Sequence, residues 1–170
     1  MSENMQSTLL NVIRSVESWH MFYAELSKNS NSGYLFEEFC KYYYLTEPSV
    51  CSEYENVWFF KEIPEKIRTK LNLGRIDHGA DLILEDKEGG FTLVQCKFRR
   101  DQDSILSWSK DKISNLFGEG GKADHLVIFT NASGLDKHSL DKQKIKLVCH
   151  GDLLEILSSN NKCNSGADYH

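Results

Sequence analysis

The sequence contains little that would mark a membrane protein, a secreted protein or a zinc protein. No apolar run approaches the roughly 20 residues that a membrane-spanning helix needs, and the N-terminus lacks the basic start and apolar stretch of a signal peptide. The five cysteines are scattered and include no CxxC pair, which argues against a zinc site or a redox motif. We therefore expect free thiols in a soluble protein of the cytoplasm or another reducing compartment.

An excess of positive charge is also missing. The 20 Lys and Arg residues against 25 Asp and Glu residues give a formal net charge of −5, whereas coating of nucleic acid relies on many basic contacts to phosphates. A local basic surface is still compatible with that total. The chain does have 170 residues, 40% of them hydrophobic, which is enough for one sizeable core. We expect one domain over residues 1–158 and a disordered polar tail over residues 159–170.

Two helices are predicted ahead of the first strand. Ser7 suits the N-cap of a helix whose apolar residues recur at helical spacing and which ends near the polar run 28–33. Residues 33–45, GYLFEEFCKYYYL, predict a second helix with a broad apolar face. Glu37 and Glu38 fall in its first turns, where the helix dipole favours carboxylates.

A β-hairpin is predicted in the middle of the chain. Residues 56–60 indicate a short buried strand, and residues 64–79 a loop with room for one helical turn. Residues 80–85 and 91–98 are two β-rich runs joined by the five-residue segment 86–90, which ends in two glycines. That length and composition are typical of a hairpin turn.

The last third of the chain alternates between helical and strand patterns. Residues 104–117 have apolar residues at helical spacing, and residues 125–130 form a continuous apolar run of the kind found in buried parallel strands. Residues 136–144 indicate a helix, residues 146–150 a strand and residues 152–157 a final helix. The order of elements predicts an α/β fold with a mixed sheet covered by helices.

Polar residues meet at one end of the predicted hairpin. Because side chains alternate along a strand, Gln95 and Lys97 share a face. With the turn centred on Glu88, Asp81 lies directly across from Gln95, and their Cβ atoms are about 4.5–5.5 Å apart. A bulge would shift this register by one residue and leave the three polar residues close together.

This grouping has two interpretations. An aspartate, an amide and a lysine would be costly to bury as packing alone, whereas oxygen ligands suit Mg²⁺ and a lysine suits an attacking water and a charged phosphate. Phosphodiester hydrolysis is the reaction that fits these groups. The alternative is purely structural, with Asp81 and Lys97 forming a cross-strand ion pair.

The motifs resemble the PD-(D/E)XK nuclease superfamily, in its Mrr-like branch with Q-x-K in place of D-x-K or E-x-K. The resemblance is carried by IDHGADLIL, the GG turn and LVQCKF, together with GYLFEEF ahead of them. It is closer still to nuclease domains fused to helicases in single-polypeptide restriction enzymes and in large-virus or phage helicases. There the counterparts are LFEEFCKYYYL, NVWFFKEIP, HGADLIL and LVQCKFRRD, so the likeness covers roughly residues 33–150.

The resemblance implies a restriction-endonuclease-like fold and a DNA endonuclease that depends on Mg²⁺, with Mn²⁺ able to substitute. It implies that Asp81 binds the metal, Gln95 takes the D/E position and Lys97 is the catalytic lysine. Glu37 would hold a metal-bound water, and the backbone carbonyl of Cys96 would be a further ligand. The implied partners are DNA and a linked or associated helicase. A non-cleaving nucleic-acid-binding module of the same fold is the alternative.

The exchange of a carboxylate for Gln95 removes one negative charge from the implied site. That change weakens metal binding or favours one ion over two, and the Mrr-like branch tolerates it. Asp77 has the spacing of an accessory acidic residue, but Asp77 and Glu38 suit solvated charges equally well.

Five residues are candidates for contact with DNA. Arg99 and Arg100 directly follow the catalytic strand, and their guanidinium groups suit phosphates. Lys110 follows in the next predicted helix, where a solvated charge is nearly as good an interpretation. Thr130 and Asn131 end the buried strand at the edge of the site, where they would either position a phosphate or base or cap the following loop.

Overall fold

The structure is a computed structural model that describes residues 9, 11–12, 18–74, 79–107, 122–136, 145–149 and 151–153. Its helices are α2 (Trp19–Lys28), α3 (Ser32–Thr46) and α4 (Glu65–Leu71), with two short 3₁₀ helices, η1 (Cys51–Glu53) and η2 (Phe60–Glu62). Its strands are β1 (Tyr54–Phe59), β2 (Leu82–Asp86), β3 (Phe91–Lys97), β4 (Ile105–Leu106), β5 (His125–Thr130), β6 (Gly134–Leu135) and β7 (Ile145–Val148).

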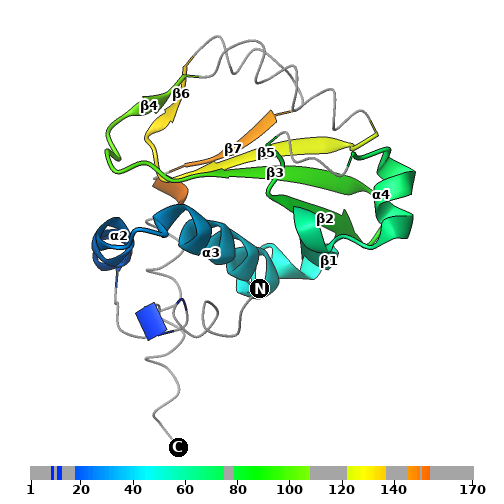
Figure 1. Cartoon of the computed structure of the whole chain (residues 1–170), viewed down its shortest axis with the longest axis horizontal. Helices are drawn as coiled ribbons and strands as arrows, with labels where there is room; N and C mark the ends of the chain where they lie inside the picture. The colour runs from blue at the N-terminus through cyan, green and yellow to red at the C-terminus, as the bar shows by residue number, and fades with distance from the viewer. Residues whose placement is uncertain are drawn as a thin grey trace, which may run out of the picture.

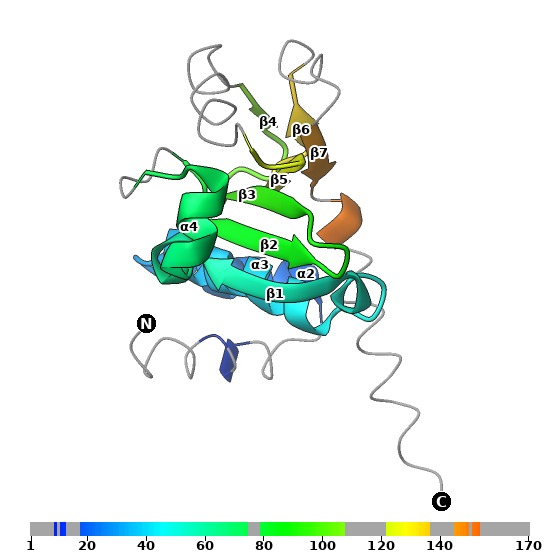
Figure 2. The ribbon, with the colours of Figure 1, turned by 90° about the vertical axis from the view of Figure 1, so that its right-hand side faces the viewer.

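Five strands form one mixed sheet in the order β1-β2-β3-β5-β7. The β1–β2 and β2–β3 pairs are antiparallel, and the β3–β5 and β5–β7 pairs are parallel. Helices α2 and α3 lie along one face of this sheet (Figures 1 and 2). The predicted mixed sheet flanked by helices is therefore confirmed.

Helix α3 covers the first of two cores. Its apolar residues recur at helical spacing, and the helix ends just before Pro48. Phe36 and Phe39 are buried and pack with Phe129 of β5, the ring centroids of Phe36 and Phe129 lying 5.9 Å apart. Val94 of β3 belongs to the same core. The predicted second helix is thus confirmed, with an aromatic cluster between it and the sheet.

Replacing Phe36 with alanine is expected to lower the free energy of unfolding by about 3–5 kcal/mol, because the lost ring leaves a cavity in a fully buried cluster. Urea denaturation followed by circular dichroism measures this change. Tyr34→Ala is the matched control on the same helix, since Tyr34 is 56% exposed. We expect the control to change stability by less than about 0.5 kcal/mol. Equal losses for the two variants would contradict the packing described.

The second core lies on the opposite face of the sheet. Its buried residues include Ile83, Leu93 and Ile128, and α4 contributes Leu71. The sequence predicted a loop with room for one helical turn over residues 64–79, and the structure has the seven-residue helix α4 there. The structural reason is that burying Leu71 against the sheet stabilises a short helix that is marginal by itself.

Two segments differ from the prediction. Helix α2 begins at Trp19 with Ser18 as its N-cap, and the Ser18 hydroxyl accepts a hydrogen bond from the Met21 N–H at 3.3 Å. The expected single helix from Ser7 is therefore interrupted, because this cap starts a new helix. Residues 105–106 form strand β4 instead of the start of a helix, since they pair in parallel with β6.

Several predictions lie outside the described residues. They are the N-cap at Ser7, most of the helix at 104–117, nearly all of the helix at 136–144, and the tail at 159–170. The helix expected from residue 152 is described only as far as Leu153, where residues 151–153 are helical. The four described cysteines are free, as predicted.

Candidate active site

The hairpin register predicted from the turn is confirmed. Leu82 pairs with Val94, and the pairing continues in step to Glu85 and Phe91 beside the turn. The paired residues end one position short of Asp81, which sits just before β2. The geometry of the site therefore depends on how Asp81 is held beyond the last pair.

Asp81 is tied to both neighbours of Gln95. Its N–H donates to the Val94 carbonyl at 2.8 Å, and one of its carboxylate oxygens accepts the Cys96 N–H at 2.7 Å. The Asp81 carbonyl accepts the Phe60 N–H at 2.9 Å, which joins the segment to the start of η2, directly after β1. The aspartate predicted to lie across from Gln95 is thus hydrogen-bonded to the residues on either side of it, and the Cys96 N–H fixes its carboxylate.

An irregularity in the chain directs the Asp81 carboxylate. Strict alternation would place Ala80 and Leu82 on one face, but Ala80 packs in the second core and Leu82 in the first. The backbone therefore departs from the regular pleat at Asp81. This departure brings the carboxylate to the level of the β3 main chain, where the Cys96 N–H meets it.

Gly79 makes room for the Gln95 side chain. It has φ of +131°, which side chains rarely allow, and a Cβ atom built on it would lie 3.2 Å from the Gln95 amide nitrogen. The amide of Gln95 is therefore packed directly against the backbone that leads into Asp81. A role for Gly79 was not predicted, although this glycine directly precedes ADLIL in the motif.

Glu37 lies on α3, the helix that contacts β3. The thiols of Cys40 and Cys96 are buried between α3 and β3, and burial is the main cause that raises the pKa of each. The negative charges of Asp81 and Glu37 raise both pKa values further. The pKa values of one buried thiol pair are therefore raised by two carboxylates from separate elements, Glu37 of α3 and Asp81 ahead of β2.

Lys97 ends β3 and is half-buried. Lys97 follows directly after Cys96, whose N–H the Asp81 carboxylate accepts. The lysine and the aspartate therefore lie at the same end of the hairpin.

Thr130 and Asn131 were predicted to contact DNA directly, but the structure does not expose them. Both are fully buried. The Thr130 hydroxyl donates to the Lys97 carbonyl at 2.7 Å, and the Asn131 amide makes two hydrogen bonds with the backbone of Arg99. Because these side chains have no exposed surface and are bound to the chain itself, they hold the strand end in place.

The other predicted DNA contacts divide by position. Arg99 and Arg100 are exposed immediately after β3. Lys110 and the accessory Asp77 lie outside the described residues.

Glu38 is not the solvated charge that was one interpretation of its position. It is 5% exposed, and neither carboxylate oxygen has a hydrogen-bond partner in the described part of the chain. Burial raises its pKa above the ordinary value of 4.5. The carboxyl next to Glu37 is therefore held in a place that disfavours its charged form.

We expect Glu38→Gln to raise the melting temperature near neutral pH. A raised pKa in the folded state means that the folded protein binds the proton more tightly than the unfolded chain. The stability linked to that proton is fully present below the unfolded pKa and is lost as pH rises through the folded pKa. Thermal melts from about pH 4 to about pH 8 should show the gain growing with pH. Glu55→Gln, at an exposed position, is the control. A gain independent of pH would contradict the interpretation.

The ligands that the resemblance implies are all oxygen atoms. They are the carboxylates of Asp81 and Glu37, the amide oxygen of Gln95 and the carbonyl of Cys96. Within the described ranges, no three His, Cys, Asp or Glu side chains gather in a way that could hold a metal. This donor set fits a hard cation that keeps several waters, as Mg²⁺ does, and does not fit a soft metal.

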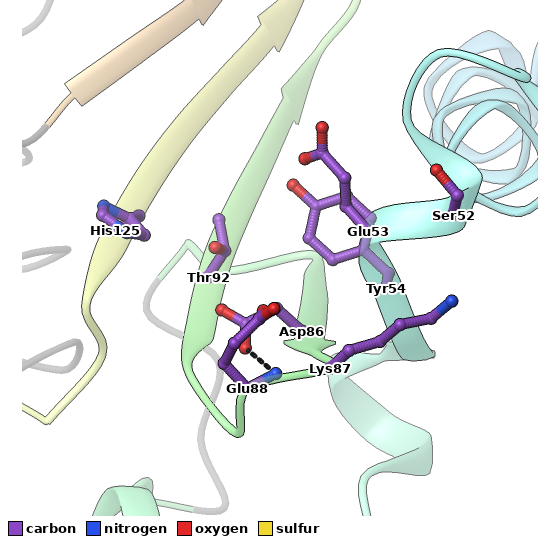
Figure 3. Close-up of a pocket in the computed structure, with 8 residues that line it drawn as sticks. All are labelled: Ser52, Glu53, Tyr54, Asp86, Lys87, Glu88, Thr92 and His125. Atoms are coloured by element: carbon purple, nitrogen blue, oxygen red, sulfur yellow. Dashed lines mark hydrogen bonds between the residues drawn. The ribbon is translucent and has the colours of Figure 1, made fainter.

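A separate pocket lies at the opposite end of the hairpin (Figure 3). Its volume is about 400 Å³, and it is lined by Ser52, Glu53, Tyr54, Asp86, Lys87, Glu88, Thr92 and His125. Burial raises the pKa of Tyr54, and the charges of Glu53 and Asp86 raise it further. Because Asp86 adjoins the turn whereas Asp81 precedes β2, this acidic pocket is distinct from the candidate active site.

No helix within the described ranges is long and apolar enough to span a membrane.

The mixed sheet, with Asp81 ahead of one hairpin strand and Gln95 and Lys97 on the other, defines the chain as an α/β protein of the restriction-endonuclease-like class. The model of a restriction endonuclease family of the Mrr type matches residues 45–160, more than half of the chain, and the chain belongs to this family. It is therefore a nuclease, and the resemblance inferred from the motifs is confirmed.

Two solved structures resemble the chain. One is the ATP-dependent Type ISP restriction-modification enzyme LlaBIII bound to DNA, with a TM-score of 0.58 and 24% identity over 78% of this chain and 8% of that one. The other is AF1548, a protein of unknown function, with a TM-score of 0.38 and 15% identity over 57% of this chain and 64% of that one. No curated protein matches the chain. The likeness to LlaBIII supports the fold, and the chain corresponds to a small part of that enzyme's length.

Proposed function

We propose that this chain is a DNA endonuclease that hydrolyses phosphodiester bonds with a divalent cation, Mg²⁺ or Mn²⁺, at Asp81. The observation that carries the proposal is the pair of main-chain hydrogen bonds that ties Asp81 across Gln95. A carboxylate held in this way is already ordered before the cation binds. Such preorganisation is typical of a catalytic ligand and unnecessary for a surface charge.

The proposed ligands come from three elements. Asp81, Gln95 and the carbonyl of Cys96 would hold the cation, and Glu37 of α3 would hold one of its waters. Two carboxylates, one amide and one carbonyl make a weakly charged set, which favours a single ion. When bound, the cation would polarise the scissile phosphate and offset its charge.

Lys97 acts on the attacking water. Its ammonium orients that water and offsets the negative charge that develops on the phosphorus centre. The water oxygen forms the new bond to phosphorus while the bond from phosphorus to one sugar oxygen breaks. The water gives up one proton and the leaving oxygen takes one, so the products are a phosphomonoester and a free hydroxyl.

The distribution of charge sets the side that faces DNA. Arg99 and Arg100 are exposed next to the site, whereas Glu53, Asp86 and Glu88 line the pocket at the far end of the hairpin. Phosphates are attracted to the first end and repelled by the second. DNA therefore approaches across the end of β3 where Lys97 lies.

The nuclease works within a larger assembly. LlaBIII is an ATP-dependent restriction-modification enzyme, and the chain covers 8% of it. We infer that this chain likewise acts together with an ATP-dependent helicase, covalently linked or associated. The alternative function is a DNA-binding module that does not cut, and the small number of carboxylates in the site is the observation that favours it.

Incubation of the purified chain with plasmid, linear and single-stranded DNA tests the proposal. We expect cleavage with Mg²⁺ or Mn²⁺ and none when EDTA is present. Intact DNA in every combination of metal and salt, with DNA still retained on the protein, would select the non-cleaving module. The absence of both cleavage and binding would reject a role on DNA for the isolated chain.

A further inference from the structure

Asn131 extends the pairing of β3 with β5 beyond its last backbone pair. That pair joins Lys97 and Thr130 at the end of both strands. Directly after it, Asn131 Oδ1 accepts the Arg99 N–H at 2.6 Å and Asn131 Nδ2 donates to the Arg99 carbonyl at 2.6 Å. An asparagine amide carries the same donor and acceptor as a peptide group, so the side chain takes the place of one more strand residue.

The segment that follows Arg99 is fixed from two sides. From α2, the Tyr23 hydroxyl donates to the Arg100 carbonyl and the Trp19 indole N–H donates to Gln102 Oε1 at 2.6 Å. From the β5–β6 connection, the Ser133 hydroxyl donates to the Gln102 carbonyl at 2.7 Å. The backbone of this segment is therefore held along its length, while the side chains of Arg99 and Arg100 remain exposed.

We propose that Asn131 is a positioning residue for DNA binding, which acts by fixing the backbone of Arg99 so that its guanidinium meets a phosphate beside the scissile one. This inference rests on the proposed function. An arginine on a loose segment loses backbone freedom as well as side-chain freedom when it binds, whereas Arg99 has its backbone fixed in advance. Only the side chain then has to become ordered on DNA.

The burial of Asn131 explains why its amide must pair with the backbone of Arg99. The residue is fully buried, so its donor and acceptor would be left unsatisfied without the Arg99 peptide groups. Thr130 holds the Lys97 carbonyl in the same way, two residues earlier. The two consecutive polar residues at the end of β5 thus fix the direction in which the chain leaves the active site.

A double-mutant cycle with Arg99→Ala and Asn131→Ala tests this inference in the full chain. Binding to a fluorescent DNA duplex is measured without divalent metal over a range of salt concentrations. We expect each single variant to bind about tenfold more weakly, with the slope of log affinity against log salt reduced by about 0.9. If Asn131 acts through Arg99, the double variant binds no more weakly than Arg99→Ala alone.

Asn56→Ala is the matched control, since Asn56 also makes a side-chain hydrogen bond, to Glu85 at 2.8 Å, but near the turn. It should leave both affinity and salt slope unchanged. If Asn131→Ala does not fold, Asn131→Thr replaces it, because threonine is uncharged, has nearly the volume of asparagine and lacks the amide that pairs with both Arg99 peptide groups.

Three results would overturn the inference. They are a folded Asn131 variant with wild-type affinity and salt slope, a double variant in which the two losses add, and an Arg99→Ala variant equal to wild type, since the role of Asn131 falls together with the role of Arg99. Failure of the proposed function is distinct from these, because it would appear as a wild-type chain that neither binds nor cleaves DNA.

Discussion

Lys97→Met should lower kcat for DNA cleavage by about a thousandfold while leaving the fold intact. Methionine keeps most of the aliphatic stem of a half-buried side chain, so the packing at the end of β3 is preserved. What is lost is the ammonium. Without it, the attacking water has no group to orient it on this side, and the charge that develops on the phosphorus centre is not offset.

Single-turnover cleavage of a plasmid measures this loss directly, and circular dichroism checks the fold. Lys87→Met is the matched control, because Lys87 lies on the turn at the other end of the hairpin. It should cleave as wild type does. A Lys97→Met variant that keeps a tenth or more of the wild-type rate would exclude a catalytic role for this lysine.

Asp81→Asn should remove detectable cleavage, a fall of at least about a thousandfold. The change replaces one oxygen by an amide group of nearly the same size and removes a negative charge. The remaining Asn oxygen can still accept the Cys96 N–H that the Asp81 carboxylate accepts at 2.7 Å, so the local fold should survive. Only Glu37 would then supply a carboxylate, which is too little charge for a hard cation.

Metal binding distinguishes the loss of a cation ligand in Asp81→Asn from general damage to the site. Calorimetric titration with Mn²⁺ should show binding to wild type and strongly weakened binding to Asp81→Asn. Asp86→Asn is the matched control, since Asp86 Oδ1 accepts two N–H groups in the hairpin turn and an Asn oxygen can do the same. Wild-type Mn²⁺ affinity in Asp81→Asn, together with lost cleavage, would show that the aspartate does not bind the cation.

Local patterns predicted the elements that depend mainly on local interactions. Helical spacing of apolar residues indicated α3, and the two glycines after Asp86 indicated a hairpin whose register the structure confirms. Patterns failed where a distant partner decided the outcome. Strand β4 exists because it pairs with β6, and α4 is stabilised by packing against the sheet, neither of which a window of sequence contains.

Capping shows a second limit of sequence interpretation. Ser18 falls inside a run of residues with suitable helical spacing, so the periodicity predicted one continuous helix. In the structure Ser18 adopts an extended conformation and caps α2. A serine in a helical pattern is compatible with both outcomes, and packing of Trp19 and Phe22 in the first core stabilises the observed one.

For the candidate site, the sequence by itself determined that Asp81, Gln95 and Lys97 lie at one end of a hairpin. Strand alternation and turn length are local properties, and they bring these three residues together whatever surrounds them. Only the tertiary structure decided that the Asp81 carboxylate is fixed by the Cys96 N–H, because this bond requires an irregular backbone at Asp81.

The tertiary structure also decided the roles of residues whose sequence pattern was ambiguous. Thr130 and Asn131 looked like DNA contacts at the end of a buried strand, and Glu38 suited a solvated charge. All three are buried, because β5 packs beside β3 and α3 packs on the sheet. Burial depends on contacts between residues far apart in the sequence, so a short polar motif specifies the chemistry available at a position but not whether solvent or DNA can reach it.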